Sequence, residues 1–118
     1  MKTEAGTDRT IPIHDAILPL FKRYYNRNNK YLFQNTRGNA MEYTNFVNSY
    51  WTPLMEHLGM MHTMHDTRHT FATLADKYRL NDYYLKLIMG HSITDITKGV
   101  YTHPDIAQLV EEINKILV

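Results

Sequence analysis

The segment His65-Asp66-Thr67-Arg68-His69 opens the stretch of sequence that decides the fold. From Asp66 onward, apolar residues recur three or four positions apart, which is the spacing of one helix face: Phe71, Leu74, Ala75 and Tyr78. We therefore predict a buried helix over residues 66–78. His65 and Arg68 stand three positions apart. At the start of that helix they would project to the same side, close to N-terminal amides that favour an anion.

Helical patterns flank this segment, so the predicted fold class is mainly α with a small β-hairpin or edge sheet (α+β). The run Thr10-Ile11-Pro12-Ile13 follows a Gly-containing turn and is typical of the end of a hairpin. Further helices are predicted over residues 16–25, 42–58, 82–89, 92–101 and 104–117. The expected helix boundaries are Asp15, Ser92 and Thr94 as N-caps and Gly59 and Gly90 as C-terminal stops, with Pro53 as a source of a kink.

Composition limits the class of protein. The 118 residues suffice for a single domain with an ordinary core, residues 1–118. The chain has no cysteine, which excludes disulfides and thiolate ligands and fits a reducing compartment. The longest aliphatic run, Leu87-Ile88-Met89, is far shorter than the roughly 20 apolar residues of a membrane span. We expect a cytoplasmic protein with no membrane partner. The net charge of +1 is only mildly basic, so any affinity for DNA must come from local patches.

Two further motifs carry residues capable of chemistry. His91 lies in Met89-Gly90-His91, and Tyr101 lies in Val100-Tyr101-Thr102-His103. A tyrosine hydroxyl, with a reference pKa of about 10, is a weak nucleophile at neutral pH and needs a group that accepts its proton or stabilises its anion. An arginine suits the non-bridging oxygens of a phosphodiester, because its planar guanidinium donates two parallel hydrogen bonds and keeps its charge.

In this order and with these separations, the motifs resemble the C-terminal part of the catalytic domain of tyrosine recombinases, the phage integrase family. Arg68 matches the family's second arginine, His65 the histidine three residues before it, His91 the later histidine of a Gly-His pair, and Tyr101 the nucleophile. Lys2 resembles the lysine of the family's hairpin. The family's first arginine lies upstream of that hairpin. The resemblance thus implies the DNA breaking-rejoining catalytic fold, truncated at its N-terminus, and we expect this chain alone to be inactive.

The resemblance implies site-specific DNA recombination, an activity associated with integration and mobile genetic elements. Tyr101 would attack the scissile phosphate and form a 3′-phosphotyrosine, with no metal or other cofactor. Lys2 would protonate the leaving 5′ oxygen, Arg68 and His91 would hold the non-bridging oxygens, and His65 would accept the proton of Tyr101. The implied partners are double-stranded DNA and other protomers. The amphipathic segment of residues 104–118 would pack against a neighbouring protomer or against its own domain.

Two alternatives remain open from the sequence. His65 and His69 stand four positions apart on the expected helix and could both bind zinc. However, Asp66 occupies the place where the usual protease motif has Glu, and Arg68 would set a cation beside the metal. The second alternative is a catalytically inactive module of the same fold that serves in DNA binding or assembly.

Overall fold

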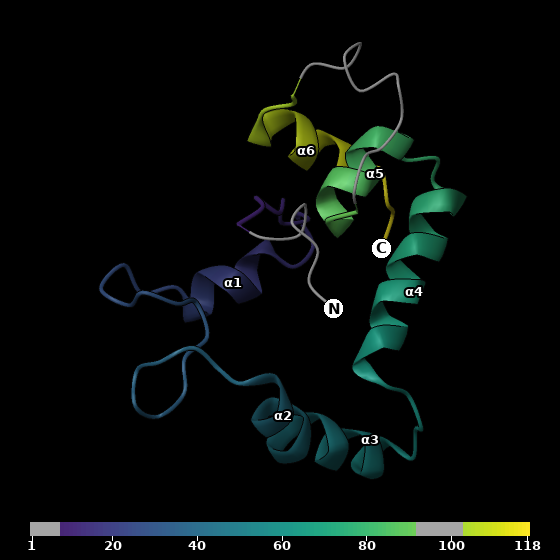
Figure 1. The fold of residues 1–118 in the computed structure, drawn as a ribbon. Coiled ribbons are helices and arrows are strands. Elements are labelled where there is room, and N and C mark those ends of the chain that lie inside the picture. The colour runs from purple at the N-terminus through teal and green to yellow at the C-terminus, as the bar shows by residue number, and fades with distance from the viewer. Residues whose placement is uncertain (1–7, 92–102) are drawn as a thin grey trace. The chain divides into compact units, whose positions relative to one another are not determined.

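The structure, a computed structural model, describes residues 8–91 and 103–118 (Figure 1). Within these residues the chain is mainly helical, and the one β pairing is an isolated antiparallel bridge between Gln34 and Ala40. The chain divides into two compact units. Unit 1 comprises Met1–Leu18 and Thr73–Val118, and unit 2 comprises Pro19–Ala72. In the described part of the chain, no helix is both long and apolar enough to cross a membrane.

The predicted N-terminal hairpin is not confirmed. Residues 10–13 form no strand, and the residues that would supply the other half of the hairpin lie outside the described ranges. This segment is attached to a helix instead: the Arg9 Nε donates a hydrogen bond of 3.1 Å to the carbonyl of Ile88 in α5, Asp82–Met89. Pro12 is buried and has no N–H to offer to a neighbouring strand.

Helix α1, Leu18–Tyr24, is shorter than predicted, and Asp15 is not its N-cap because the helix begins three residues later. His14 organises this start instead. Its carbonyl accepts the N–H groups of Ile17 and Leu18, both at 3.0 Å, and its Nδ1 accepts the N–H of Ala16 at 2.9 Å. Since Nδ1 is an acceptor, the proton sits on Nε2, which donates to the carbonyl of Ile116 at 2.7 Å.

The predicted helix over residues 42–58 is confirmed, but it contains a π-helical turn. Helix α2, Tyr43–Phe46, is followed directly by the π-helix η2, Val47–Trp51, and by α3, Thr52–Leu58. The Thr52 N–H donates to the carbonyl of Val47, five residues earlier. Pro53 explains the wider turn: it has no N–H, and its ring would collide with the carbonyl four residues before it. Gly59 ends α3 with a φ of 66°, as its position predicted.

Helix α4, Met64–Lys77, confirms the helix predicted from residue 66, although the burial expected of it is wrong. Ala75 alone is buried in this helix, while Phe71, Leu74 and Tyr78 are half-buried. The apolar spacing defined the helix face. How much of that face is covered depends on neighbouring segments that the spacing does not specify.

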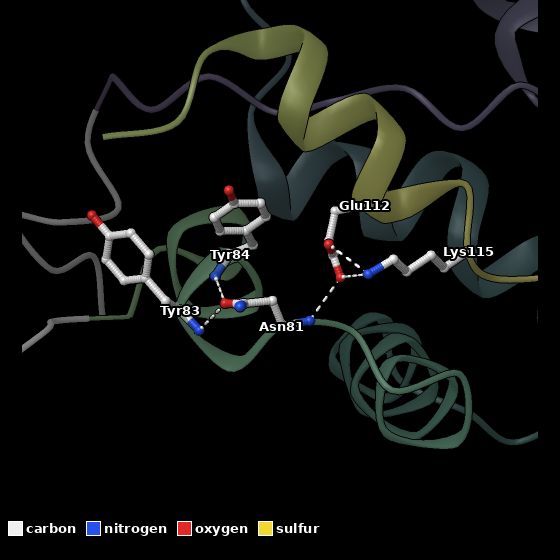
Figure 2. A network of polar contacts seen from close by, with 5 residues as sticks. All are labelled: Asn81, Tyr83, Tyr84, Glu112 and Lys115. Atoms are coloured by element: carbon white, nitrogen blue, oxygen red, sulfur yellow. Dashed lines mark hydrogen bonds and ion pairs between the residues drawn. The ribbon is translucent and has the colours of Figure 1, made fainter. Parts of the chain in front are cut away.

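The core of unit 1 forms around α5 and α6, Ile106–Ile113. Buried apolar side chains gather here: Ala75, Leu80, Ile88, Met89, Leu109, Ile113 and Ile116. A polar network joins the two helices (Figure 2). The Asn81 side chain caps α5 by accepting the N–H groups of Tyr83 and Tyr84, and the Asn81 N–H donates to the buried Glu112 carboxylate of α6 at 2.7 Å. The Lys115 ammonium donates to both oxygens of that carboxylate, at 2.9 and 3.0 Å.

The C-terminal helix is also shorter than predicted. It begins with a capping box, in which Asp105 accepts the N–H of Gln108 at 2.9 Å and the Gln108 side chain accepts the N–H of Asp105 at 2.8 Å. Part of its apolar stripe packs within the chain, since Leu109 and Ile113 are buried. The helix predicted for residues 92–101 lies outside the described residues.

Candidate active site

The first two turns of α4 carry two of the predicted site residues. His65 is the second residue of this helix, and Arg68 follows three positions later. At this spacing both side chains leave the same side of the helix. His65 is exposed and Arg68 is half-buried. The His65 imidazole, which can accept a hydrogen bond, and the Arg68 guanidinium, which keeps its positive charge, therefore lie on one side of the helix near its N-terminus. The backbone amides of that terminus add to the attraction for an anion.

Asp66 fixes the start of this helix. Its Oδ2 accepts the backbone N–H of Thr63 at 2.8 Å and lies 3.5 Å from the Nδ1 of His62. These contacts close the turn that precedes the helix. The N–H of Thr63 is the main reason that the pKa of the Asp66 carboxyl lies below its ordinary value, and the side chains of His62 and Thr63 lower it further. Asp66 thus stabilises the start of the helix that carries His65 and Arg68.

The lowered pKa of Asp66 predicts a pH dependence of the helix start. Because folding favours the ionised carboxyl, its contribution to stability is present above the pKa of the unfolded chain and is lost as the pH falls through the folded pKa. Asparagine cannot be protonated in this pH range. We therefore expect the stability of the helix start in Asp66→Asn no longer to decrease as the pH falls. Carboxyl NMR titration together with hydrogen exchange of the Thr63 amide would measure both effects. Identical exchange-against-pH curves for the two proteins would contradict this role.

His91 follows α5 in unit 1, and its backbone is held by the way the helix ends. Gly90 adopts a φ of 74°, a left-handed conformation that glycine takes without steric cost. The His91 N–H then donates to the carbonyl of Lys86 at 2.9 Å. This six-to-one bond is typical of the Schellman motif. It fixes the backbone of His91 directly after the helix, and the His91 side chain is exposed.

The five predicted site residues fall into three groups. His65 and Arg68 are brought together on the part of α4 that belongs to unit 2, and His91 belongs to unit 1. Tyr101 and Lys2 lie outside the described residues.

The zinc alternative finds little support in the described residues. The rings of His65 and His69 meet edge to face, with centroids 4.8 Å apart. No group of three or more His, Asp or Glu side chains able to hold a metal occurs in residues 8–91 and 103–118. A zinc site in proteins ordinarily has at least three protein ligands.

Sequence reasoning missed the contribution of His62 and Asp66. The available signal was the spacing of Thr63 and Asp66, a hydroxyl residue followed three positions later by an acid, which resembles a capping box.

The start of α4, with His65 and Arg68 beside the backbone amides of the helix N-terminus, is a candidate phosphate-binding site. Comparison with known families agrees, because the sequence profile of the phage integrase family matches residues 1–108. The chain therefore belongs to the phage integrase family.

Two similar proteins are tyrosine recombinases by name. Tyrosine recombinase XerC-like of Caldanaerobacter subterraneus subsp. tengcongensis is 26% identical over an alignment that covers 80% of this chain and 28% of that protein. Tyrosine recombinase XerA of Pyrococcus furiosus is 29% identical, covering 95% of this chain and 41% of that protein. The chain thus spans less than half the length of these relatives. No solved structure matches significantly.

Proposed function

We propose that residues 1–118 form the C-terminal portion of a tyrosine recombinase catalytic domain, which takes part in site-specific cleavage and rejoining of DNA. The observation that carries this proposal is the pairing of His65 and Arg68 at the start of α4, in a chain of the phage integrase family. This pair has the charge, the donors and the helix-end location that suit a phosphodiester.

The proposed reaction needs no energy source beyond the DNA itself. The Tyr101 oxygen attacks the scissile phosphorus, a P–O bond to Tyr101 forms, and the bond to the 5′ oxygen breaks. The product is a 3′-phosphotyrosine and a free 5′-hydroxyl, and attack by a 5′-hydroxyl reverses the step. His65 accepts the proton of Tyr101, and Lys2 returns a proton to the leaving oxygen.

The roles of the remaining groups follow from where negative charge develops. The transition state places charge on the two non-bridging oxygens, and Arg68 and His91 donate hydrogen bonds to them. Each has a backbone set by its own helix within its own unit, Arg68 in α4 and His91 directly after α5.

The proposed partners are double-stranded DNA and further protomers assembled on it. In α6 and the residues after it, Ile106 is 49% exposed and Leu117 is 72% exposed, whereas Leu109 and Ile113 are buried. A contact with another protomer would therefore use the exposed part of the apolar stripe and leave the buried part in its own core.

The proposal is tested by trapping the covalent intermediate. The complete protein and its Tyr101→Phe variant are incubated with a nicked suicide substrate carrying the recombination site, and adducts that survive denaturation are counted. We expect an adduct from the unaltered protein and none from the variant, since Phe has no nucleophilic oxygen. DNA binding without an adduct from either protein would contradict the proposal and leave the alternative, a catalytically inactive DNA-binding or assembly module.

A further inference from the structure

Positive charge is concentrated in one stretch of unit 2. Residues 19–41 hold five of the chain's thirteen lysines and arginines and none of its twelve carboxylates. Two of these side chains lie in the last turn of α1 and three in the loops that follow it, and we call the five together the basic loop surface: Lys22, Arg23, Arg27, Lys30 and Arg37. A chain with a net charge of +1 therefore carries a strongly positive segment whose balancing acids lie elsewhere in the sequence.

The five cations are available to an outside partner. All of them are exposed. In residues 8–91 and 103–118, none of the five makes an ion pair with a carboxylate. Their neighbours are aromatic: the Arg23 guanidinium lies 6.0 Å from the centroid of Tyr24, and the Lys30 ammonium lies 5.4 Å from that of Tyr31. Such contacts leave the charge unneutralised.

The first loop of this surface is closed by aromatic packing. The ring centroid of Phe33 lies 6.1 Å from that of Phe21 and 5.8 Å from that of Tyr24, so the segment after the loop packs against α1. Between these contacts the Asn26 side chain accepts the N–H of Asn28 at 2.9 Å and the Asn26 carbonyl accepts that of Asn29 at 3.0 Å. The loop bearing Arg27 and Lys30 therefore has a defined turn, which reduces the entropy lost on binding.

The second loop is built around Asn35. The Asn35 side chain accepts the N–H groups of Arg37 and Asn39, both at 2.9 Å, and the Asn35 N–H donates to the carbonyl of Asn39 at 2.8 Å. Gly38 completes the turn at a φ of 78°. Arg37 thus sits in a tight turn whose backbone is fixed by hydrogen bonds.

We propose that the basic loop surface binds the phosphate backbone of duplex DNA independently of base sequence. This inference rests on the proposed function for its choice of DNA. Charge complementarity and the exposed cations support it. The five asparagines of the two loops also favour DNA over an anionic membrane, since Asn side chains commonly donate hydrogen bonds to phosphates and sugars.

The test compares two matched double variants of the complete protein on random-sequence duplex DNA. Arg27→Gln/Lys30→Gln removes two cations of the surface, and Lys77→Gln/Arg79→Gln removes one lysine and one arginine elsewhere. The control is closely matched, because both lysines lie near the ring of the next residue. The Lys77 ammonium lies 5.3 Å from the ring centroid of Tyr78, and the Lys30 ammonium lies 5.4 Å from that of Tyr31. Binding is measured by fluorescence anisotropy between about 50 and 200 mM salt.

We expect the surface variant to bind roughly tenfold more weakly near 100 mM salt and to lower the steepness of log K against log salt by about 2, as for two lost phosphate contacts. The control should change affinity by no more than about twofold. Arg37→Gln should add to the loss, and Arg37→Lys should retain binding. Equal losses in the two double variants would overturn the inference, because the effect would then reflect net charge alone.

Two further readouts separate the possible partners and functions. The surface variant is also compared with the unaltered protein for binding to phosphatidylserine vesicles. If the variant loses vesicle binding while its DNA affinity is unchanged, the inference is overturned in favour of a membrane partner. The surface variant should still form the Tyr101 adduct at saturating DNA. If the unaltered protein forms no adduct but the surface variant still shows the predicted loss of DNA affinity, the proposed chemistry is refuted and the inference about the basic loop surface is supported.

Discussion

Arg68→Ala is expected to slow formation of the covalent DNA adduct by about 10²–10³-fold, the usual cost of removing one preorganised donor to a developing oxyanion. Arg68 lies in the second turn of α4 and is half-buried, so the helix sets the position of its backbone. Arg68→Lys should recover part of the rate, because the charge returns without the two parallel hydrogen bonds. Single-turnover adduct formation on the suicide substrate measures the effect.

The control for this prediction is Arg79→Ala, which removes an exposed arginine just beyond the end of the same helix. Its adduct rate should match that of the unaltered protein. DNA affinity and thermal unfolding of the Arg68 variants should also be measured, since the half-buried Arg68 contributes to packing as well. An unchanged adduct rate in Arg68→Ala would remove Arg68 from the proposed site.

Glu112→Ala is expected to destabilise unit 1 by roughly 2–3 kcal/mol, since the variant loses charge-assisted hydrogen bonds to Asn81 and Lys115 and leaves a gap beside α5. Asn81 is the N-cap of α5, so the loss reaches the helix that leads to His91. Urea unfolding measures the global change. Hydrogen exchange at the amides of Tyr83 and Tyr84 measures the local opening of the cap.

Glu111→Ala is the matched control, because it removes the preceding glutamate of the same helix, which is exposed. Its free energy of unfolding should change by no more than about 0.5 kcal/mol. The free energy of unfolding of Glu112→Gln should lie between those of Glu112→Ala and Glu111→Ala, because an amide oxygen can still accept the N–H of Asn81. Equal stability of the Glu111 and Glu112 variants would show that the network in Figure 2 contributes little.

Local patterns predicted most of the helices correctly. The apolar spacing over residues 66–78 and 82–89 matches α4 and α5 closely, and Gly59 and Gly90 end their helices as predicted. Such signals act over a few residues, within the reach of one turn. The strand predicted at residues 10–13 is not confirmed: these residues form no strand, and the neighbouring Arg9 contacts α5. A strand depends on a partner that can be distant in sequence, so a local pattern predicts it less securely than a helix.

The sequence by itself predicted the family, because the order and spacing of its motifs resemble that family, and the match to residues 1–108 confirms it. It also determined that His65 and Arg68, three positions apart on one helix, share a face, while the chemistry assigned to them stays a proposal. Only the tertiary structure decided the role of Glu112, which reads as an ordinary polar residue of an amphipathic helix. Its carboxylate is buried because it meets the N–H of Asn81, 31 residues away in the chain. Contacts between distant residues depend on how the chain packs, and no local pattern encodes them.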